Sequence, residues 1–360
     1  ITGDIADNYR GNTNPIYYQQ MEEDWNLYTQ LLTDLDHYFN DNQSIERSNP
    51  SEQNSDYRMT FLKNPLHVAG NHDIFNIYSY DSKRHFADGI LYNKSTNIIS
   101  SYTFDSNITF VKINPFSFPS ATSAIIWWIS PEKRIRSEIS NFLGKLHQKD
   151  TNNQYQYQIN QNHDSDDKIY KQTIVLCHIP ARMWFPTFST TLSNPTNNVK
   201  IYLSGHLHPK KPQILHHGRS IEVVGTPLFR YNQVGLASLD NGHFSYHQMN
   251  LSLKKFAILT FPNPDATRSS LERFDETLDR TGIRAVSFSG DMNLSFRIDN
   301  GQTQRLKCAK KLKYRKSSSF SEERYNQNIF LCTEKPAFDP SVPIHGKHVF
   351  TKLGDWEGNF

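Results

Sequence analysis

Two short stretches of this chain carry side chains that could do chemistry together. Gly-Asn-His-Asp at residues 70–73 follows the apolar run 66–69, and Gly-His-Leu-His at residues 205–208 follows the apolar run 201–204. A glycine directly after such a run lets the backbone turn sharply where a buried strand ends. We therefore expect the imidazole, amide and carboxylate groups of both stretches to meet at the carboxyl edge of one sheet, where open α/β sheets bind ligands.

Two further segments fit the same pattern. Gly3 and Asp4 stand close to the start of the sequence, and the apolar run 173–177 ends directly before His178. Taken singly, a Gly-Asp pair usually marks a turn, and a strand-end histidine is usually packed in a core. Four strand ends that deliver carboxylate, amide and imidazole groups in this order predict a metal site, and this ligand mixture suits Mn, Fe and Zn alike.

In combination, these motifs resemble the signature of the calcineurin-like metallophosphoesterases. Five stretches are similar to the transmembrane protein 62 family, at residues 23–28, 70–77, 202–208, 259–264 and 283–289. Because these stretches are spread along the sequence, the resemblance covers most of the chain. The resemblance implies an α/β fold with a metallophosphoesterase-type layered β-sheet domain flanked by helices. A small all-β immunoglobulin-like sandwich and then membrane spans would follow it.

The resemblance also implies a ligand set for two divalent metal ions. Asp4 would bridge the ions, Asn71, His178 and His206 would complete one site, and His208 would serve the other. The pattern of the family begins with an Asp-x-His motif that this sequence does not contain. We therefore expect the sequence to be a fragment, with the remaining ligands of the second site lying upstream of it.

The chemistry implied is metal-dependent hydrolysis of a phosphoester by a hydroxide that bridges the two ions. His72 would protonate the leaving oxygen, and Asp73 would orient that imidazole and stabilise its charge. The alternative is a catalytically inactive scaffold or accessory subunit of a membrane-associated assembly. The bulky segment 180–186 leaves both readings open, because it could form a specificity wall or fill the cleft; the presence of every ligand that falls within the sequence favours the enzyme.

A chain of 360 residues favours one large α/β domain and a smaller second domain. We expect the phosphoesterase domain at residues 1–252, with polar insertions near 41–57 and 148–167, and the immunoglobulin-like domain at 253–360. Apolar spacing predicts helices at 21–39 and from Ser130-Pro131 to about residue 146. Strands are expected at 66–69, 99–104, 108–113, 173–177, 201–204, 221–224, 257–261, 283–288 and 294–298, with a hairpin at 234–249.

Charge and cysteine content bear on partners and compartment. A net charge of +3 gives no case for nucleic acid. The resemblance implies a phosphoester substrate and leaves room for protein partners in a complex. The similarity to a membrane family implies an anchor beyond Phe360 and a membrane-associated, endomembrane location rather than the cytosol. Cys177 is expected to be a buried apolar side chain, whereas Cys308 and Cys332 could pair if the compartment is oxidising.

Overall fold

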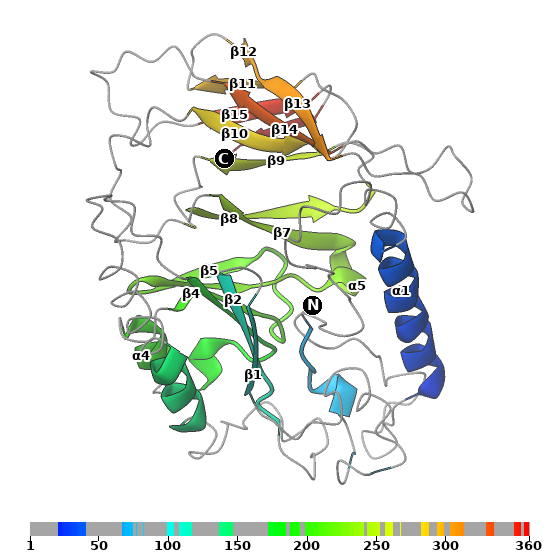
Figure 1. Ribbon diagram of the computed structural model, residues 1–360, viewed down its shortest axis with the longest axis vertical. Helices are drawn as coiled ribbons and strands as arrows, with labels where there is room; N and C mark the ends of the chain where they lie inside the picture. The colour runs from blue at the N-terminus through cyan, green and yellow to red at the C-terminus, as the bar shows by residue number, and fades with distance from the viewer. Residues whose placement is uncertain are drawn as a thin grey trace, which may run out of the picture. The chain divides into compact units, whose positions relative to one another are not determined.

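The computed structural model divides into two compact units, residues Ile1–Gly225 and Thr226–Phe360. The structure describes residues 21–40, 67–74, 77, 82, 99–103, 108–116, 137–146, 172–184, 188–194, 199–240, 243–252, 256–261, 267, 282–287, 294–298, 303–312, 329–334, 349–353 and 356–359. The fold is mixed α/β, with one mixed six-stranded sheet and several small antiparallel sheets (Figure 1).

The first unit is built on the six-stranded sheet, whose strand order is β1-β2-β3-β4-β6-β5. Its strands are β1 (Ile99–Thr103), β2 (Ile108–Ile113), β3 (Gln172–Cys177), β4 (Val199–Ser204), β5 (Gln213–His217) and β6 (Ser220–Val224). β2, β3, β4 and β6 run parallel, whereas β1 and β5 are antiparallel edge strands. The carboxyl ends of four neighbouring strands therefore meet at one edge.

Burial explains why the central strands read as continuous apolar runs. All five residues of β6 are buried, as are the last five of β3, because a parallel strand is covered on both faces. One face packs against helical residues 137–146 through Ile139 and Leu143, which confirms the C-terminal part of the helix predicted from Ser130. Val175 and Tyr202 contribute to this core from the sheet.

The other long helix of the first unit is α1 (Glu22–Asn40), which confirms the helix predicted from apolar spacing. Trp25, Tyr28 and Leu32 are buried on one of its faces. Leu31 is also apolar but does not share this face and is 51% exposed. It lies one residue before Leu32 and is therefore rotated by about 100° around the helix axis.

The strand predicted at 66–69 is wrong for its described residues. Residues 67–70 belong to no strand, and the short 3₁₀ helix η2 (His72–Ile74) follows them. His67, Val68 and Ala69 are nevertheless almost completely buried. Their apolar character therefore reflects burial, which a periodicity argument cannot distinguish from strand pairing.

The second unit begins with α5 (Leu228–Tyr231) and a hairpin of β7 (Gln233–Asp240) and β8 (His243–Asn250), which confirms the predicted hairpin. One antiparallel sheet follows the order β13-β14-β10-β9: Lys307–Leu312, Ile329–Glu334, Ile283–Ser287 and Ala257–Phe261. A second follows the order β12-β11-β15-β16: Gln304–Arg305, Leu294–Ile298, Val349–Leu353 and Trp356–Asn359. Residues from both sheets form one buried cluster.

The hairpin is hydrogen-bonded to the strands that follow it. The Ser245 hydroxyl and His247 Nε2–H both donate to the Leu259 carbonyl oxygen, at 3.0 and 2.7 Å. Arg284 Nε donates to the Asp240 carboxylate at 2.8 Å, and the guanidinium also lies over the Phe261 ring. The predicted domain boundary at residue 252 stays a prediction; among the described residues, the hairpin makes these bonds with the β strands of the second unit.

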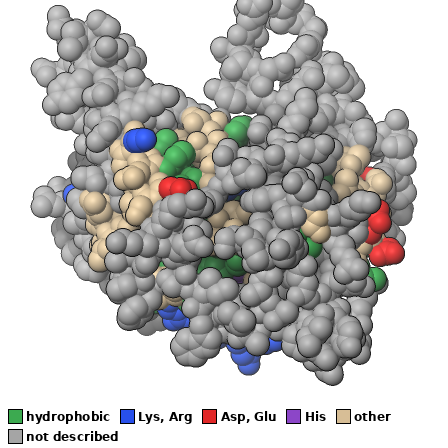
Figure 2. Space-filling model, turned by 90° about the horizontal axis from the view of Figure 1, so that it is seen from below, with side chains coloured by type: hydrophobic (Ala, Val, Ile, Leu, Met, Phe, Trp, Pro, Cys, Tyr) green, Lys and Arg blue, Asp and Glu red, His purple; other side chains and the backbone are tan. Residues whose placement is uncertain are grey.

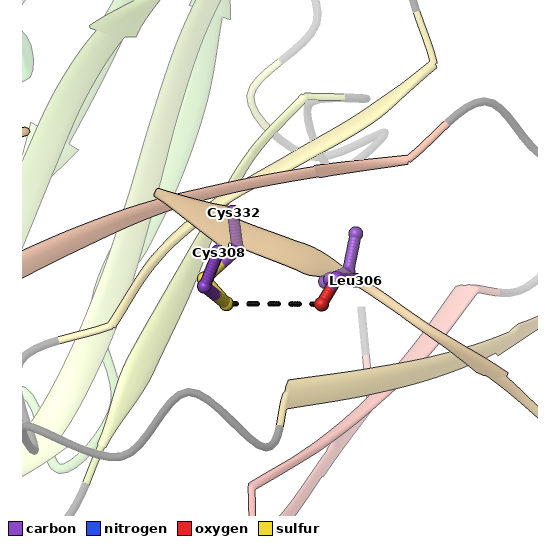
Figure 3. Close-up of a disulfide and its surroundings, with 3 residues drawn as sticks. All are labelled: Leu306, Cys308 and Cys332. Carbon is purple, nitrogen blue, oxygen red and sulfur yellow. Dashed lines mark hydrogen bonds between the residues drawn. A yellow bond between two sulfur atoms is a disulfide. The ribbon is translucent and has the colours of Figure 1, made fainter. Parts of the chain in front are cut away.

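A disulfide joins Cys308 of β13 to Cys332 of β14 (Figure 3). The two residues stand directly opposite each other in the register of the antiparallel pair. The Cys308 sulfur lies 3.9 Å from the Leu306 carbonyl oxygen, a packing contact since a disulfide sulfur carries no proton. Cys177 is a free, fully buried thiol in the core of the first unit, as its apolar surroundings predicted.

Several expectations lie outside the described residues: Asp4, the polar insertions at 41–57 and 148–167, and part of the helix that begins at Ser130. Among the described helices, none combines the length and the apolar character needed to cross a bilayer. On the face drawn in Figure 2, the described Lys and Arg side chains lie scattered rather than gathered in one place.

Candidate metal centre

Three side chains from distant parts of the first unit converge on one point. His178 Nε2 lies 2.9 Å from Asn71 Oδ1 and 3.1 Å from His206 Nδ1, and His206 Nδ1 lies 2.9 Å from Asn71 Oδ1. All three residues are buried, with exposed fractions of 1–6%. The sequence predicted these residues as ligands of one metal ion, and the structure brings them together.

Hydrogen bonding alone does not account for this triangle. The amide oxygen can only accept, so each ring nitrogen beside it should carry a proton. If both nitrogens carry protons, however, the 3.1 Å contact between His178 and His206 joins two donors. If only one is protonated, the other nitrogen faces the amide oxygen as a second acceptor. No assignment of protons turns all three contacts into hydrogen bonds.

A shared cation fits the same three atoms. Metal–nitrogen and metal–oxygen bonds to Zn²⁺ or Mg²⁺ are about 2.0–2.2 Å long. Two ligands at right angles around such an ion are therefore about 3.0 Å apart, which matches the observed separations of 2.9, 2.9 and 3.1 Å. Neutral imidazole and amide oxygen are suitable donors for such ions. The residues present therefore fit a divalent metal.

The sheet positions the two histidines. His178 is the first residue after β3, and His206 follows the neighbouring strand β4 by two residues. The Gly205 backbone N–H donates to the His178 carbonyl oxygen at 3.0 Å, which ties the two strand ends together. On the other side of β4, the Gly225 N–H donates to the Ser204 carbonyl oxygen at 2.9 Å. Backbone bonds thus hold this edge from β3 to β6.

The backbone at His206 is itself unusual. The Leu207 N–H donates to the Gly205 carbonyl oxygen at 2.8 Å, closing a three-residue turn around His206, whose φ is 66°. A γ-turn with positive φ is rare and strained. His208 has a φ of 50° as well. Histidine occupies this region of φ far less readily than glycine, and such strain concentrates at functional sites.

The turn that carries Asn71 is held by its neighbour. Asp73 is completely buried, and its Oδ2 accepts the Gly70 backbone N–H at 2.8 Å. His72 is only partly buried, unlike the residues on either side of it. This exposure suits a side chain that must reach a substrate. The predicted contact in which Asp73 orients His72 stays a prediction.

A buried tyrosine stands behind this turn. The Tyr28 hydroxyl lies 2.8 Å from His67 Nδ1, and the two rings are in edge-to-face contact. Burial, and then the negative charge of Asp73, raise the pKa of Tyr28 well above its usual value. Tyr28 is therefore a neutral hydroxyl that links α1 to the segment leading into Gly70.

Two predicted ligands stay untested. Asp4 lies outside the described residues, and no described contact joins His208 to the triangle, so both assignments stay predictions. Within the part of the chain that the structure describes, no group of three or more His, Cys, Asp or Glu side chains gathers around a point. The cluster of Asn71, His178 and His206 is not such a group, because it contains only two residues of those four types and its third donor is an asparagine.

The sequence did not reveal what fixes the segment after His178. The Ile179 carbonyl oxygen accepts the Tyr202 hydroxyl at 2.6 Å and Trp184 Nε1–H at 3.2 Å. Glu222 Oε1 accepts the Ala181 backbone N–H at 2.7 Å, and its Oε2 accepts His217 Nε2–H at 2.8 Å. The sequence offers one sign of this arrangement, which is that Glu222 places a carboxylate within the otherwise apolar run 221–224.

These bonds also bear on residues 180–184, the described part of the bulky segment 180–186. Trp184 is fully buried and packs in the core of the unit, so it forms no pocket wall.

Burial raises the pKa of the neighbouring Cys177 thiol to about 12. The pKa of Tyr202 is also raised, again chiefly by burial. Both groups are therefore neutral near pH 7 and act through packing and hydrogen bonds.

Comparison with known proteins adds no family assignment: no protein-family model matches the chain, and no curated protein sequence matches it. Function is therefore inferred from the motifs and from the geometry of the edge where Asn71, His178 and His206 meet.

Proposed function

We propose that this protein is a metal-dependent phosphoester hydrolase of the calcineurin-like metallophosphoesterase class, similar to the transmembrane protein 62 family. One observation carries the proposal. Asn71 Oδ1, His178 Nε2 and His206 Nδ1 are spaced as three ligands of one ion, at the carboxyl edge of a mostly parallel sheet. They are the same residues that the family motifs assign to one metal site.

The finer fold assignment is part of this proposal. The first domain, residues 1–252, would be a metallophosphoesterase domain, and residues 253–360 would form an immunoglobulin-like sandwich. The six-stranded mixed sheet supports the first assignment, since its neighbouring parallel strands β3 and β4 carry His178 and His206 to one edge. The two four-stranded antiparallel sheets that share a buried cluster support the second.

Two divalent ions, Mn, Fe or Zn, are the proposed cofactors. Asn71, His178 and His206 would hold one ion, Asp4 would be shared, and His208 would belong to the other. Such ions, when bound, activate water at neutral pH and neutralise negative charge on phosphoryl oxygens. The strained backbone at His206 and His208 is consistent with ligands that are fixed before the ion arrives.

The residues of the chain itself would bind, orient and move one proton. His72 would donate a proton to the leaving oxygen, because it lies directly beside a ligand and is more exposed than its neighbours. Asp73 would keep the turn closed through its bond to Gly70 and would place a negative charge behind His72. The bonds from Tyr202 and Glu222 would keep the segment after His178 from shifting.

We also propose a membrane-associated, endomembrane setting, a phosphoester substrate and protein partners in a complex. The Cys308–Cys332 disulfide supports the setting for the second unit, because structural disulfides persist in oxidising compartments.

The proposed hydrolase can be tested by measuring how the turnover of the His72→Ala variant depends on the leaving group of the ester. We expect its turnover of an unactivated alkyl phosphoester to fall roughly 10²–10⁴-fold, with metal content unchanged. The leaving group of a nitrophenyl ester needs less protonation, so turnover of that ester by the variant should fall by a smaller factor. The exposed His216 provides the matched control, and His216→Ala should behave as wild type. Equal losses for both esters would remove His72 from the acid role.

The same assay addresses the alternative of an inactive scaffold. A wild-type protein that binds the metal but turns over neither ester, with or without added metal, would act by binding alone. Metal analysis alongside the assay separates this result from simple failure to load the ion.

A further inference from the structure

Asn114 lies next to the ligand cluster and has a donor group that the described residues leave unused. It is the first residue after β2, and β2 pairs with β3 so that Ile113 stands beside Cys177. One residue further on, Asn114 and His178 are therefore neighbours at the same edge. The Phe116 ring, two residues later, lies 6.1 Å from the His178 ring.

The orientation of the Asn114 amide is fixed by a backbone bond. The Phe116 N–H donates to Asn114 Oδ1 at 3.4 Å. Only the oxygen of a side-chain amide can accept a hydrogen bond, so this bond determines which side of the amide carries the NH₂ group. Nδ2 has no hydrogen-bond partner among the described residues, although the residue is only 9% exposed.

A buried amide donor without a partner is energetically unfavourable, and such groups in folded proteins commonly await a ligand, water or ion. Nδ2 can only donate, so its natural partner is an acceptor. The neighbouring ligands do not supply one, because His178 and Asn71 already face each other. Lys112, two residues earlier, lies on the same face of β2, and burial lowers the pKa of its amine.

We infer that Asn114 Nδ2–H donates to a phosphoryl oxygen of the bound substrate. This inference deepens the proposed function and rests on it, since the phosphoester is the acceptor that would come to this edge. An oxyanion suits the position, because it brings several acceptor oxygens to a buried amide donor that lacks a partner among the described residues. Asn114 would fix the substrate without taking part in proton transfer.

Binding of inorganic phosphate tests this inference. Asn114→Asp keeps an oxygen for the Phe116 N–H and replaces the NH₂ donor with a second oxygen. We expect the metal-loaded variant to bind phosphate on the order of 10- to 100-fold more weakly than wild type in calorimetry, with equal metal content. Asn114→Ser removes the amide without adding charge and should show a weakening of similar size, which covers the case in which Asn114→Asp fails to fold.

Gln172 provides the matched control. It begins β3, so Gln172→Glu makes the same amide-to-carboxylate change at the opposite edge of the sheet, roughly 20 Å away. This variant should bind phosphate as wild type does. If the Asn114 variants also bind phosphate like wild type, or if wild type binds none at millimolar concentration, the inference is overturned.

Phosphoester turnover, measured in parallel, separates this inference from the proposed function. Wild-type turnover combined with unchanged phosphate binding in both Asn114 variants would leave the hydrolase intact and remove Asn114 from the site. Phosphate binding that depends on Asn114, in a protein that hydrolyses no ester, would support the phosphate contact and contradict the hydrolase.

Discussion

Glu222 Oε1 accepts the Ala181 backbone N–H at 2.7 Å, although the two residues are 41 positions apart. The carboxylate is fully buried, and its second oxygen pairs with His217 at 2.8 Å. Ala181 lies three residues after His178, so this bond holds the segment that leaves the ligand. A buried carboxylate is expensive unless both oxygens are satisfied, and here both are.

Removing this carboxylate should destabilise the first unit. Glu222→Leu leaves the Ala181 N–H and His217 without their partner, so we expect the free energy of unfolding to fall by about 3–5 kcal/mol in urea titration. Glu222→Gln keeps one acceptor and should lose only about 1–3 kcal/mol. Arg182→Ala, which removes an exposed bond to Gln213, is the control and should change stability by less than about 0.5 kcal/mol. Equal stability of the Leu variant and wild type would contradict this account.

Divalent metal should stabilise the protein through the three clustered ligands. An ion that binds only the folded state adds about 2.7 kcal/mol at 100 times its Kd, which raises the melting temperature. We expect Mn²⁺ or Zn²⁺ to raise it and a chelator to reverse the rise. His206→Ala should abolish the effect, whereas His216→Ala should retain it. An identical metal response in wild type and His206→Ala would rule out this site.

The extent of the first domain can be tested by truncation. A chain that ends at Ser252 keeps the β7–β8 hairpin but removes Leu259 and Arg284, with which Ser245, His247 and Asp240 are bonded. A chain that ends at Gly225 lacks the hairpin altogether, so none of these three side chains is left without its partner. In size-exclusion chromatography we expect the shorter chain to be the more monomeric. The opposite order would favour the boundary near residue 252.

Cysteine alkylation should distinguish the three sulfurs. With a pKa of about 12, only about one in ten thousand Cys177 thiols would be ionised at pH 8, and the side chain is fully buried. Iodoacetamide should therefore label no cysteine in the native protein, one after unfolding without reductant, and all three after unfolding with reductant. Mass spectrometry counts the labels. Three labels without reductant would mean that Cys308 and Cys332 are not joined.

Local signals made part of this molecule predictable. The Asp240-Asn241-Gly242 turn gave the hairpin, and the glycine after each apolar run gave the motifs that carry Asn71 and His206. These features depend on residues close together in sequence. The strand expected at 66–69 failed because burial without strand pairing produces the same apolar pattern.

Other features depend on contacts between distant residues and leave little trace in sequence. The Tyr202 hydroxyl bonds to a carbonyl 23 residues earlier, and Glu222 bonds to Ala181 across the sheet. Asn114 is a polar residue directly after β2, a common position for such residues, so the sequence alone does not mark it. Only the strand order, which places β2 beside β3, makes it a neighbour of His178.

The bond between Cys308 and Cys332 closes a covalent ring over a separation of 24 residues. A single peptide cleavage inside that ring would leave both products joined through sulfur. The nicked chain would then migrate as one species on a denaturing gel and separate into two fragments only after reduction. The second unit could thus be cut between β13 and β14 without losing either strand.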